Sequence, residues 1–375
     1  MSNQSEQMDI LTGLPNITYF RSLSQKILDD VNERAKGLVF IYFDIKHFRS
    51  FNYYYGFDAG DRYLVKVGNI IKQVFPELYV SRFADDHFTV IAYNRNIEKR
   101  LERVRNLSII DTMIKAMSIK AGIYIVPSDG SSKNSVRAYD NAKLACENIK
   151  KSVNINNCYY TDELGKREKL REHIIETVDE AIEKEYFKVY YQPIVHVLSG
   201  RLCGYEGLAR WIDPEFGFLS PADFITTLED ARLIHRLDAY MIGKICRDMR
   251  KYKDKGWNVV PVSVNLSALD FQMADMPEIA NHAIKENELP YDFLNIEITE
   301  AALSGGRKDV HEVLDRFRKS GFEIWMDNFG SKYSSLNILE DVEVDLLKVD
   351  MRFLRNFHSS SRSRTILKNI MNMAK

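Results

Sequence analysis

The chain has 375 residues, of which 45% are hydrophobic, so it is long enough to build two domains with separate buried cores. Its 52 Lys and Arg residues nearly cancel its 53 Asp and Glu residues, which argues against a nucleic-acid-binding surface built on bulk positive charge. The four cysteines lack metal-site spacing, no apolar run is long enough to span a bilayer, and the residues MSNQSEQMDI contain no signal-peptide core. We therefore expect a cytoplasmic protein with no membrane span and no nucleic-acid partner.

The first half of the chain alternates helix and strand patterns. Asn16 is a predicted N-cap, and the four residues 84–87 between two apolar runs predict a tight hairpin. Residues 51–61 are rich in turn formers and predict an irregular segment. The other predicted elements are helices at 17–31, 64–74 and 134–150 and strands at 38–44, 78–83, 88–93 and 117–126. This order predicts that residues 1–162 form an α+β sandwich of the ferredoxin-like or polymerase-palm type.

The second half predicts a β/α barrel. A charged amphipathic helix over 162–186 is expected to join the two domains. Short apolar runs separated by helix-length stretches are typical of buried parallel strands, and they occur at 188–195, 202–206, 259–265, 293–298, 322–327 and 344–349. A closed barrel of this type needs eight strands. We therefore expect residues 163–375 to be a C-terminally truncated TIM-like barrel that lacks its last two β/α units, in preference to a natural six-strand variant.

Oxygen-bearing side chains stand at the ends of four of these runs: Glu206, Asn265, Glu297 and Asp327. The carboxyl ends of barrel strands meet at one face, so these side chains are expected to converge there. Three converging carboxylates repel one another unless a cation lies between them, and oxygen donors suit Mg²⁺ or Mn²⁺. The pattern predicts metal-assisted chemistry on a phosphate ester.

Motifs of the first half resemble those of the GGDEF family, the diguanylate cyclases. They are "DILTGLPN" (9–16), "FDIKHFRSFN" (43–52) and "ADDHF" (84–88). The resemblance implies a degenerate nucleotide and metal site at Asp44, Asn52 and Asp86. The two glycines of the family signature are replaced by Ala84 and Asp85, and its glutamate is replaced by His87.

These replacements remove the backbone freedom and the acid that the cyclase site uses. We expect a catalytically inactive GGDEF domain that regulates or dimerises the protein. GTP stays open as a ligand of this domain, and so does a scaffold role without any ligand.

The second half resembles the EAL family of cyclic di-GMP phosphodiesterases. The motifs are "YYQPIV" (190–195), "YEGLARW" (205–211), "VSVNLS" (262–267), "IEITE" (296–300), "DNFGSKYSSL" (327–336) and "LLKVD" (346–350). The resemblance implies metal ligands at Glu206, Asn265, Glu297, Asp327 and Asn328. It implies catalytic roles for Glu206, Lys348 and Glu300, and substrate contacts for Gln192 and Arg210.

The function implied by this resemblance is hydrolysis of cyclic di-GMP to linear pGpG with Mg²⁺ or Mn²⁺ by a protein that we expect to be a homodimer. Asn328 replaces an aspartate of the family, and an amide carries no charge, so a second metal ion is expected to bind more weakly. A receptor that binds cyclic di-GMP without hydrolysing it is therefore the alternative.

Overall fold

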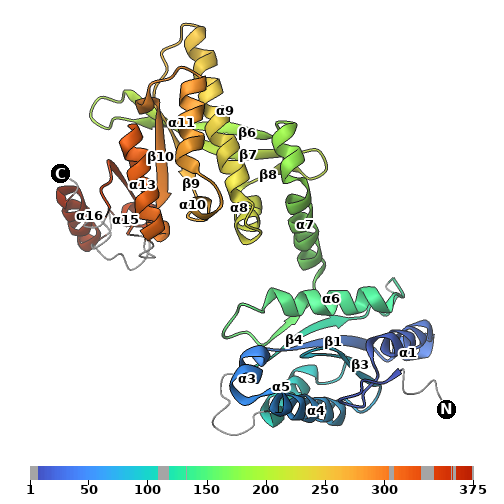
Figure 1. Cartoon of the computed structure of the whole chain (residues 1–375). Coiled ribbons are helices and arrows are strands. Elements are labelled where there is room, and N and C mark those ends of the chain that lie inside the picture. The colour runs from blue at the N-terminus through green and yellow to red at the C-terminus, as the bar shows by residue number, and fades with distance from the viewer. Residues whose placement is uncertain are drawn as a thin grey trace. The chain divides into compact units, whose positions relative to one another are not determined.

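The computed structural model describes residues 7–108, 118–131, 133–303, 308–330, 342–355, 357 and 360–373, without the side chains of residues 308 and 309. The chain forms two compact units, Met1–Glu168 and Lys169–Lys375 (Figure 1). The helices of the first unit are α1 (Ile17–Asp29), α2 (Val31–Ala35), α3 (Phe48–Tyr55), α4 (Phe57–Val74), α5 (Ile97–Ser108) and α6 (Ser135–Asn148). Its strands are β1 (Leu38–Ile45), β2 (Tyr79–Ala84), β3 (His87–Tyr93), β4 (Ile119–Ile125) and β5 (Asn157–Tyr159).

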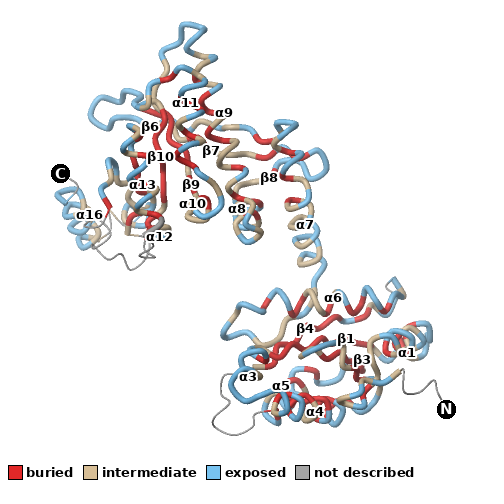
Figure 2. The backbone as a smooth tube through the Cα atoms, in the orientation of Figure 1, coloured by how far each residue is buried: buried red, intermediate tan, exposed pale blue. Residues whose placement is uncertain are grey.

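The sheet of the first unit has the order β2-β3-β1-β4-β5. β1 pairs antiparallel with β3 and β4, and all eight of its residues are buried (Figure 2). Side chains of successive β1 residues point to opposite faces. The face of β1 that carries Phe43 packs against α4 and α5. The opposite face, which carries Phe40 and Tyr42, packs against α1 and α6. The order β1-α-β2-β3-α5-β4 is that of the ferredoxin-like motif, as predicted, and β5 extends it.

Two local predictions have opposite outcomes. The hairpin at 84–87 is confirmed, because β2 and β3 pair antiparallel and Asp85 has the left-handed φ of 45° that a tight turn needs. The irregular segment predicted at 51–61 is wrong. It is helical on both sides of Gly56, whose φ of 84° separates α3 from α4. Burial of Phe51 and Tyr63 on these helices outweighs the weak turn preference of the intervening residues.

The second unit begins within α7 (Asp162–Glu183). Its strands are β6 (Phe187–Val195), β7 (Leu202–Asp213), β8 (Gly217–Leu219), β9 (Val262–Leu266), β10 (Leu294–Thr299), β11 (Ile324–Phe329) and β12 (Leu346–Val349). The remaining helices are α8 (Pro221–Asp230), α9 (Ile234–Asp254), α10 (Asp270–Met273), α11 (Met276–Glu286), α12 (Glu300–Leu303), α13 (Lys308–Ser320), α15 (Met351–Arg355) and α16 (Ser361–Met373), with a 3-10 turn at Tyr291–Phe293.

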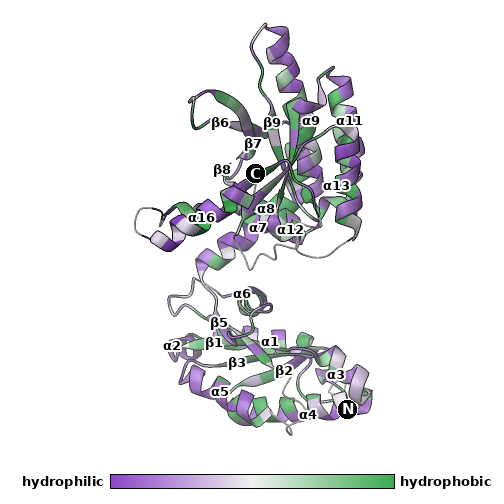
Figure 3. Ribbon diagram, turned by 90° about the vertical axis from the view of Figure 1, so that its left-hand side faces the viewer, coloured by the Kyte–Doolittle hydropathy of each residue, from purple (hydrophilic) through white to green (hydrophobic). Residues whose placement is uncertain are grey.

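These strands form one sheet of order β12-β11-β10-β9-β7-β6, with β8 paired to β7. Hydrophobic strands and helices with polar outer surfaces are visible in Figure 3, and α9, α11 and α13 pack along the sheet. Within the described residues no pairing joins β12 to β6, so the sheet is open there. Truncation of a longer barrel stays a prediction.

Two features of this sheet correct the sequence analysis. β6 is antiparallel to β7, because the short connection at 196–201 cannot carry the crossover that parallel neighbours need. Glu206 lies inside β7, which continues to Asp213, and therefore does not end its strand. The β7 residues after Glu206 pair with β6 and, at the end of the strand, with β8. This pairing extends β7 beyond Glu206. No helix in the described part of the chain is long and apolar enough to cross a membrane.

Candidate functional site

The register of the second sheet brings the predicted ligands to one face. Glu297 of β10 lies opposite Asn265 of β9, and Glu206 of β7 lies opposite Ser263, two residues before Asn265. Asp327 of β11 lies opposite Thr299, two residues after Glu297. Side chains two residues apart on a strand share a face. The structure therefore brings these four predicted residues together, although they are separated by up to 121 positions in the sequence.

Lys348 of β12 lies at the centre of this group. Its Nζ donates to Glu206 Oε2 at 2.7 Å and to the two carboxylate oxygens of Glu297 at 2.6 and 2.5 Å. Asn265 Nδ2 donates to the other oxygen of Glu206 at 3.1 Å. An ammonium group thus bridges two of the carboxylates, which shows that this face attracts and holds positive charge.

Burial and mutual repulsion affect the protonation of these groups. Burial raises the pKa of Glu297 above its usual value, and the charges of Glu206 and Asp327 add to the rise against the opposing effect of Lys348. Burial likewise raises the pKa of Asp327. Burial acts to lower the pKa of Lys348, but its hydrogen bonds to the two glutamates outweigh that effect and raise it. A divalent cation placed here would reverse the rise in the carboxylates.

The donor set fits a hard divalent cation. Three carboxylates and the amide oxygen of Asn265 are the ligands that Mg²⁺ and Mn²⁺ accept. Asn328 has a left-handed φ of 56°, and its Nδ2 donates to Asp327 Oδ2 at 2.5 Å. The amide of Asn328 therefore occupies one oxygen of Asp327, a predicted ligand, and adds no charge to the site.

Glu300 lies at the start of α12, directly after β10, and is buried. Its Oε2 accepts a hydrogen bond from the backbone N–H of Gly330 at 2.9 Å, which ties the end of β11 to the end of β10. The remainder of the motif 327–336, including Lys332, falls outside the described residues.

Gln192 and Arg210 lie on the same side of the β6–β7 pair as Glu206. Gln192 is directly opposite Glu206 in the antiparallel register, and Arg210 follows Glu206 by four residues on β7. The Arg210 guanidinium donates to the Ala209 carbonyl at 2.8 Å and lies 5.5 Å from the centre of the Tyr190 ring. Gln192 is exposed.

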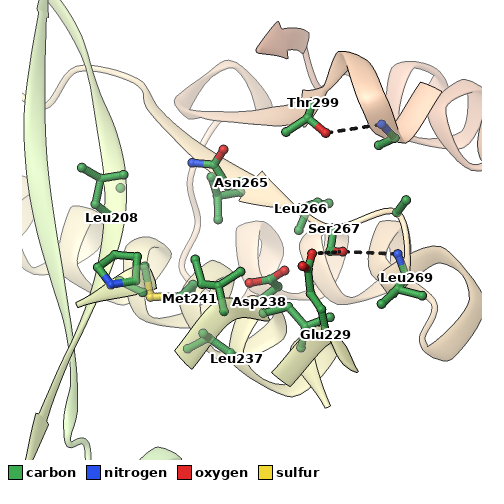
Figure 4. Close-up of a pocket in the computed structure, with 18 of the residues that line it drawn as sticks. Leu208, Glu229, Leu237, Asp238, Met241, Asn265, Leu266, Ser267, Leu269 and Thr299 are labelled. Atoms are coloured by element: carbon green, nitrogen blue, oxygen red, sulfur yellow. Dashed lines mark hydrogen bonds between the residues drawn. The ribbon is translucent and has the colours of Figure 1, made fainter. Parts of the chain in front are cut away.

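Of the predicted site residues, Asn265 lines a cavity of about 590 Å³ (Figure 4). Its lining includes Asn265 together with Leu208, Glu229, Leu237, Asp238, Met241 and Thr299, several of which extend into it in the close-up. Glu229 accepts a hydrogen bond from Ser267 Oγ at 2.8 Å. Glu229 and Asp238 were not predicted as site residues from the sequence. The signal for Asp238 was a carboxylate within the apolar stripe of α9, next to Leu237.

Asp238 also forms a pair with Asp270, which is fully buried. Burial and the neighbouring Asp270 raise the pKa of Asp238 well above its usual value, and burial raises the pKa of Asp270 to about 6. Two facing carboxyls in such a position are stable only when at least one is protonated.

This pair should make folding stability depend on pH. The folded state keeps the proton of Asp270 to a higher pH than the unfolded state, so the free energy of unfolding falls as pH rises from about 4 to about 6. Asp270→Asn should stabilise the protein by about 2 kcal/mol at pH 7.5 and by less at pH 5. Urea unfolding at both pH values measures this, with the exposed Asp292→Asn as control. An equal effect of Asp270→Asn at both pH values would show that ionisation of Asp270 does not destabilise the folded state.

In the first unit, the structure brings together two of the three predicted site residues. Asp44 is buried, and its Oδ2 lies 2.6 Å from Lys150 Nζ. The His87 imidazole lies between the carboxylates of Asp44 and Asp86. Burial acts to raise the pKa of Asp44, but hydrogen bonds from His87 and Lys150 outweigh it and lower the pKa; burial raises the pKa of Asp86. The third predicted residue, Asn52, packs against Gly60, where a Cβ would stand 1.9 Å from its Oδ1.

Comparison with known proteins matches both units. The family model of the EAL domain matches residues 175–375, and that of the diguanylate cyclase GGDEF domain matches residues 6–154. The cyclic di-GMP phosphodiesterase NbdA of Pseudomonas aeruginosa is 30% identical over 99% of this chain and 48% of its own length. The cyclic di-GMP phosphodiesterase PdeR of Escherichia coli is 27% identical over 98% of this chain and 56% of its own. The chain thus spans about half the length of these curated relatives.

Among solved structures, the S helix-GGDEF-EAL portion of LapD from Vibrio cholerae, bound to c-di-GMP, superposes with a TM-score of 0.52. It covers 99% of this chain and 88% of the LapD chain at 17% identity, so this likeness concerns the fold. The domain order predicted from the motifs is confirmed. Because the EAL model covers more than half of its residues, the chain belongs to the EAL family, and a GGDEF domain precedes its EAL domain.

Proposed function

We propose that the second unit hydrolyses cyclic di-GMP to linear pGpG with Mg²⁺ or Mn²⁺. The observation that carries this proposal is the meeting of Glu206, Glu297 and Lys348 from three strands on one face, where Glu206 also contacts Asn265, a residue that lines a cavity. Two relatives that are similar over nearly the whole chain bear the name of cyclic di-GMP phosphodiesterases. The family membership and the donor set together favour a phosphodiester as substrate.

Each residue has a definite role in this proposal. Glu206, Asn265, Glu297 and Asp327, with a weak contribution from Asn328, would hold the metal. The metal, when bound, supplies Lewis acidity and makes its bound water more acidic. The Lys348 ammonium, already aimed at the carboxylates, would stabilise the negative charge that develops on the phosphoryl oxygens. Gln192 and Arg210 would contact the substrate, and Glu300 would position the segment after β11 through Gly330.

The direct test is turnover. The purified protein is incubated with cyclic di-GMP and Mn²⁺ or Mg²⁺, and the nucleotides are separated by chromatography. We expect linear pGpG to accumulate, and no linear product with either metal would refute hydrolysis. Size-exclusion chromatography with light scattering tests the predicted homodimer in the same preparation.

The first unit is proposed as a regulatory GGDEF domain without cyclase activity. Its hairpin places Asp85 at a left-handed turn position, where it adds a carboxylate to a site that would have to receive phosphates. Incubation with GTP and Mg²⁺ should give no cyclic di-GMP. Calorimetry with GTP then decides whether this domain keeps a nucleotide site or serves as a scaffold.

One observation favours a receptor that does not hydrolyse cyclic di-GMP. The Asn328 amide donates to Asp327, so it competes with a metal ion for that carboxylate. If the missing negative charge at position 328 limits the reaction, Asn328→Asp should raise turnover about tenfold. Aspartate tolerates the left-handed backbone at this position and restores an anionic ligand. Steady-state kinetics across a Mn²⁺ titration measures the effect. An already active wild type that is unchanged by the substitution would exclude the receptor alternative.

A further inference from the structure

Two polar side chains neighbour Glu206 on the inner face of the second sheet, which is the face turned away from the core formed with α9, α11 and α13. Ser263 of β9 pairs with Glu206 of β7 on one side and with Asn295 of β10 on the other. The three side chains therefore form one row across neighbouring strands, with about 4.8 Å between one strand and the next. Neither Ser263 nor Asn295 was predicted as a site residue from the sequence.

Both side chains are buried without a polar contact. Ser263 is 0% exposed and Asn295 is 2% exposed, and among the described residues Ser263 Oγ and Asn295 Oδ1 have no hydrogen-bond partner. The residues that alternate with them, such as Val262, Leu294 and Ile296, pack in the hydrophobic core on the helix side. Bulky apolar side chains usually fill the inner face of a barrel sheet, and a buried polar group without a partner destabilises the fold. The presence of this serine and this asparagine therefore needs an explanation other than stability.

The contacts that hold Glu206 in the structure are ones that a divalent ion disturbs. Glu206 Oε2 accepts from Lys348 Nζ at 2.7 Å, and Glu206 Oε1 accepts from Asn265 Nδ2 at 3.1 Å. An ammonium group and a metal cation repel each other, and an asparagine coordinates a metal through its oxygen and not through Nδ2. Glu206 therefore needs another hydrogen-bond donor when it acts as a metal ligand. The Ser263 hydroxyl lies on the adjacent strand directly opposite Glu206 and has no other partner among the described residues.

We propose that Ser263 and Asn295 are positioning residues for Glu206. The Ser263 hydroxyl donates to the Glu206 carboxylate when that carboxylate holds a metal ion, and it accepts from Asn295. A hydroxyl can donate and accept at the same time, and the terminal torsion of an asparagine is soft enough for its Nδ2 to turn toward Ser263 Oγ. Hydrogen bonds to ligating carboxylates fix their orientation and strengthen metal binding. This inference rests on the metal site of the proposed function and adds the residues that orient one of its ligands.

Ser263→Ala tests this role, with Mn²⁺ binding to the whole chain followed by electron paramagnetic resonance of the free ion. The Mn²⁺ equivalent of the second unit is the one that Glu206→Gln loses. We expect Ser263→Ala to weaken the binding of this equivalent about tenfold. In EDTA, the same substitution should raise the midpoint of urea unfolding, because it removes a buried hydroxyl without a partner. Tryptophan fluorescence reports this unfolding, since all three tryptophans lie in the second unit: Trp211, Trp257 and Trp325.

Opposite changes in stability and in metal affinity distinguish positioning from packing. An unchanged Mn²⁺ affinity of Ser263→Ala, or a loss of both affinity and stability, would overturn the proposal. Thr89→Val is the matched control, because Thr89 of the first unit is also fully buried and its Oγ1 also has no partner among the described residues. This control should leave the Mn²⁺ equivalent of the second unit unchanged. An equal loss with Thr89→Val would show that the effect is not specific to Ser263 and would likewise count against the proposal.

A second variant tests Asn295. Asn295→Leu keeps the branching and the number of heavy atoms of the side chain and removes its polar groups. We expect it to weaken Mn²⁺ binding about tenfold, and the double variant with Ser263→Ala to lose about tenfold in total, because Asn295 acts only through Ser263. A full affinity of Asn295→Leu, or losses that multiply in the double variant, would refute the role of Asn295.

These measurements use no cyclic di-GMP, so their failure is distinguishable from failure of the proposed function. If Glu206→Gln loses no Mn²⁺ equivalent, the metal site is absent and both the proposed function and this inference fail. If Glu206→Gln loses one equivalent and Ser263→Ala binds it as tightly as the wild type does, only this inference fails.

Discussion

Glu206→Gln is expected to lower kcat for cyclic di-GMP hydrolysis by about a thousandfold, with little change in the folded structure. The substitution keeps the shape of the side chain and removes one negative charge. In the wild type, Oε2 of Glu206 accepts from Lys348 at 2.7 Å and Oε1 accepts from Asn265 at 3.1 Å. A neutral amide can make only one of these contacts as an acceptor, and it binds a divalent cation far more weakly than a carboxylate does.

The measurement is steady-state kinetics of pGpG formation at several Mn²⁺ concentrations. Glu278→Gln, an exposed residue in the first turn of α11, controls for the loss of a surface charge and should keep wild-type kinetics. Calorimetry with cyclic di-GMP separates binding from chemistry. A Glu206→Gln protein that retains turnover within a few fold of the wild type would mean that this face is not where the phosphate is hydrolysed.

Lys348→Met should destabilise the metal-free protein by about 3 kcal/mol, because it leaves the buried Glu297 carboxylate without its cation. The Glu297 side chain is fully buried and receives two hydrogen bonds from Lys348. Removing the ammonium raises the pKa of Glu297 further, since burial and the charges of Glu206 and Asp327 then act without opposition. Protonation of Glu297 relieves this cost, so the difference from the wild type should be smaller at pH 5 than at pH 8.

Divalent metal should restore much of this lost stability, since a bound cation replaces the missing charge and binds only the folded state. Urea unfolding with and without Mn²⁺ measures both effects. Lys319→Met, at the end of α13, is the control for loss of a lysine on a neighbouring element. If Mn²⁺ failed to stabilise Lys348→Met more than the control, the metal and the ammonium would not share one site.

Much of the candidate site could be predicted from the sequence because polar residues at the ends of apolar runs mark the ends of buried strands. Asn265, Glu297, Asp327 and Lys348 each interrupt an apolar run, and the parallel register then carries all of them to one face. Glu206 was found for the same reason, although its strand continues to Asp213. The short connection before β7 is the sequence signal for the antiparallel direction of β6, which the prediction of parallel strands did not take into account.

Other residues could not be assigned without the tertiary structure. Asp238 and Asp270 are 32 positions apart on different helices, and only the packing of α9 against α10 makes them a pair. His87 looked like the remainder of a lost catalytic position until the β1–β3 register placed it opposite Asp44. Lys150 carries no local signal, because a lysine after an amphipathic helix is ordinarily a solvated surface residue.

The sequence by itself determined the two families, the order of the domains and the oxygen-bearing side chains that meet on the second sheet, because hydrophobic periodicity and motif order are local properties of the chain. The tertiary structure decided which charges face each other: Lys348 between Glu206 and Glu297, Asp238 against Asp270, and His87 between Asp44 and Asp86. Those pairings depend on strand register and helix packing, in which a shift of one residue turns a side chain to the opposite face.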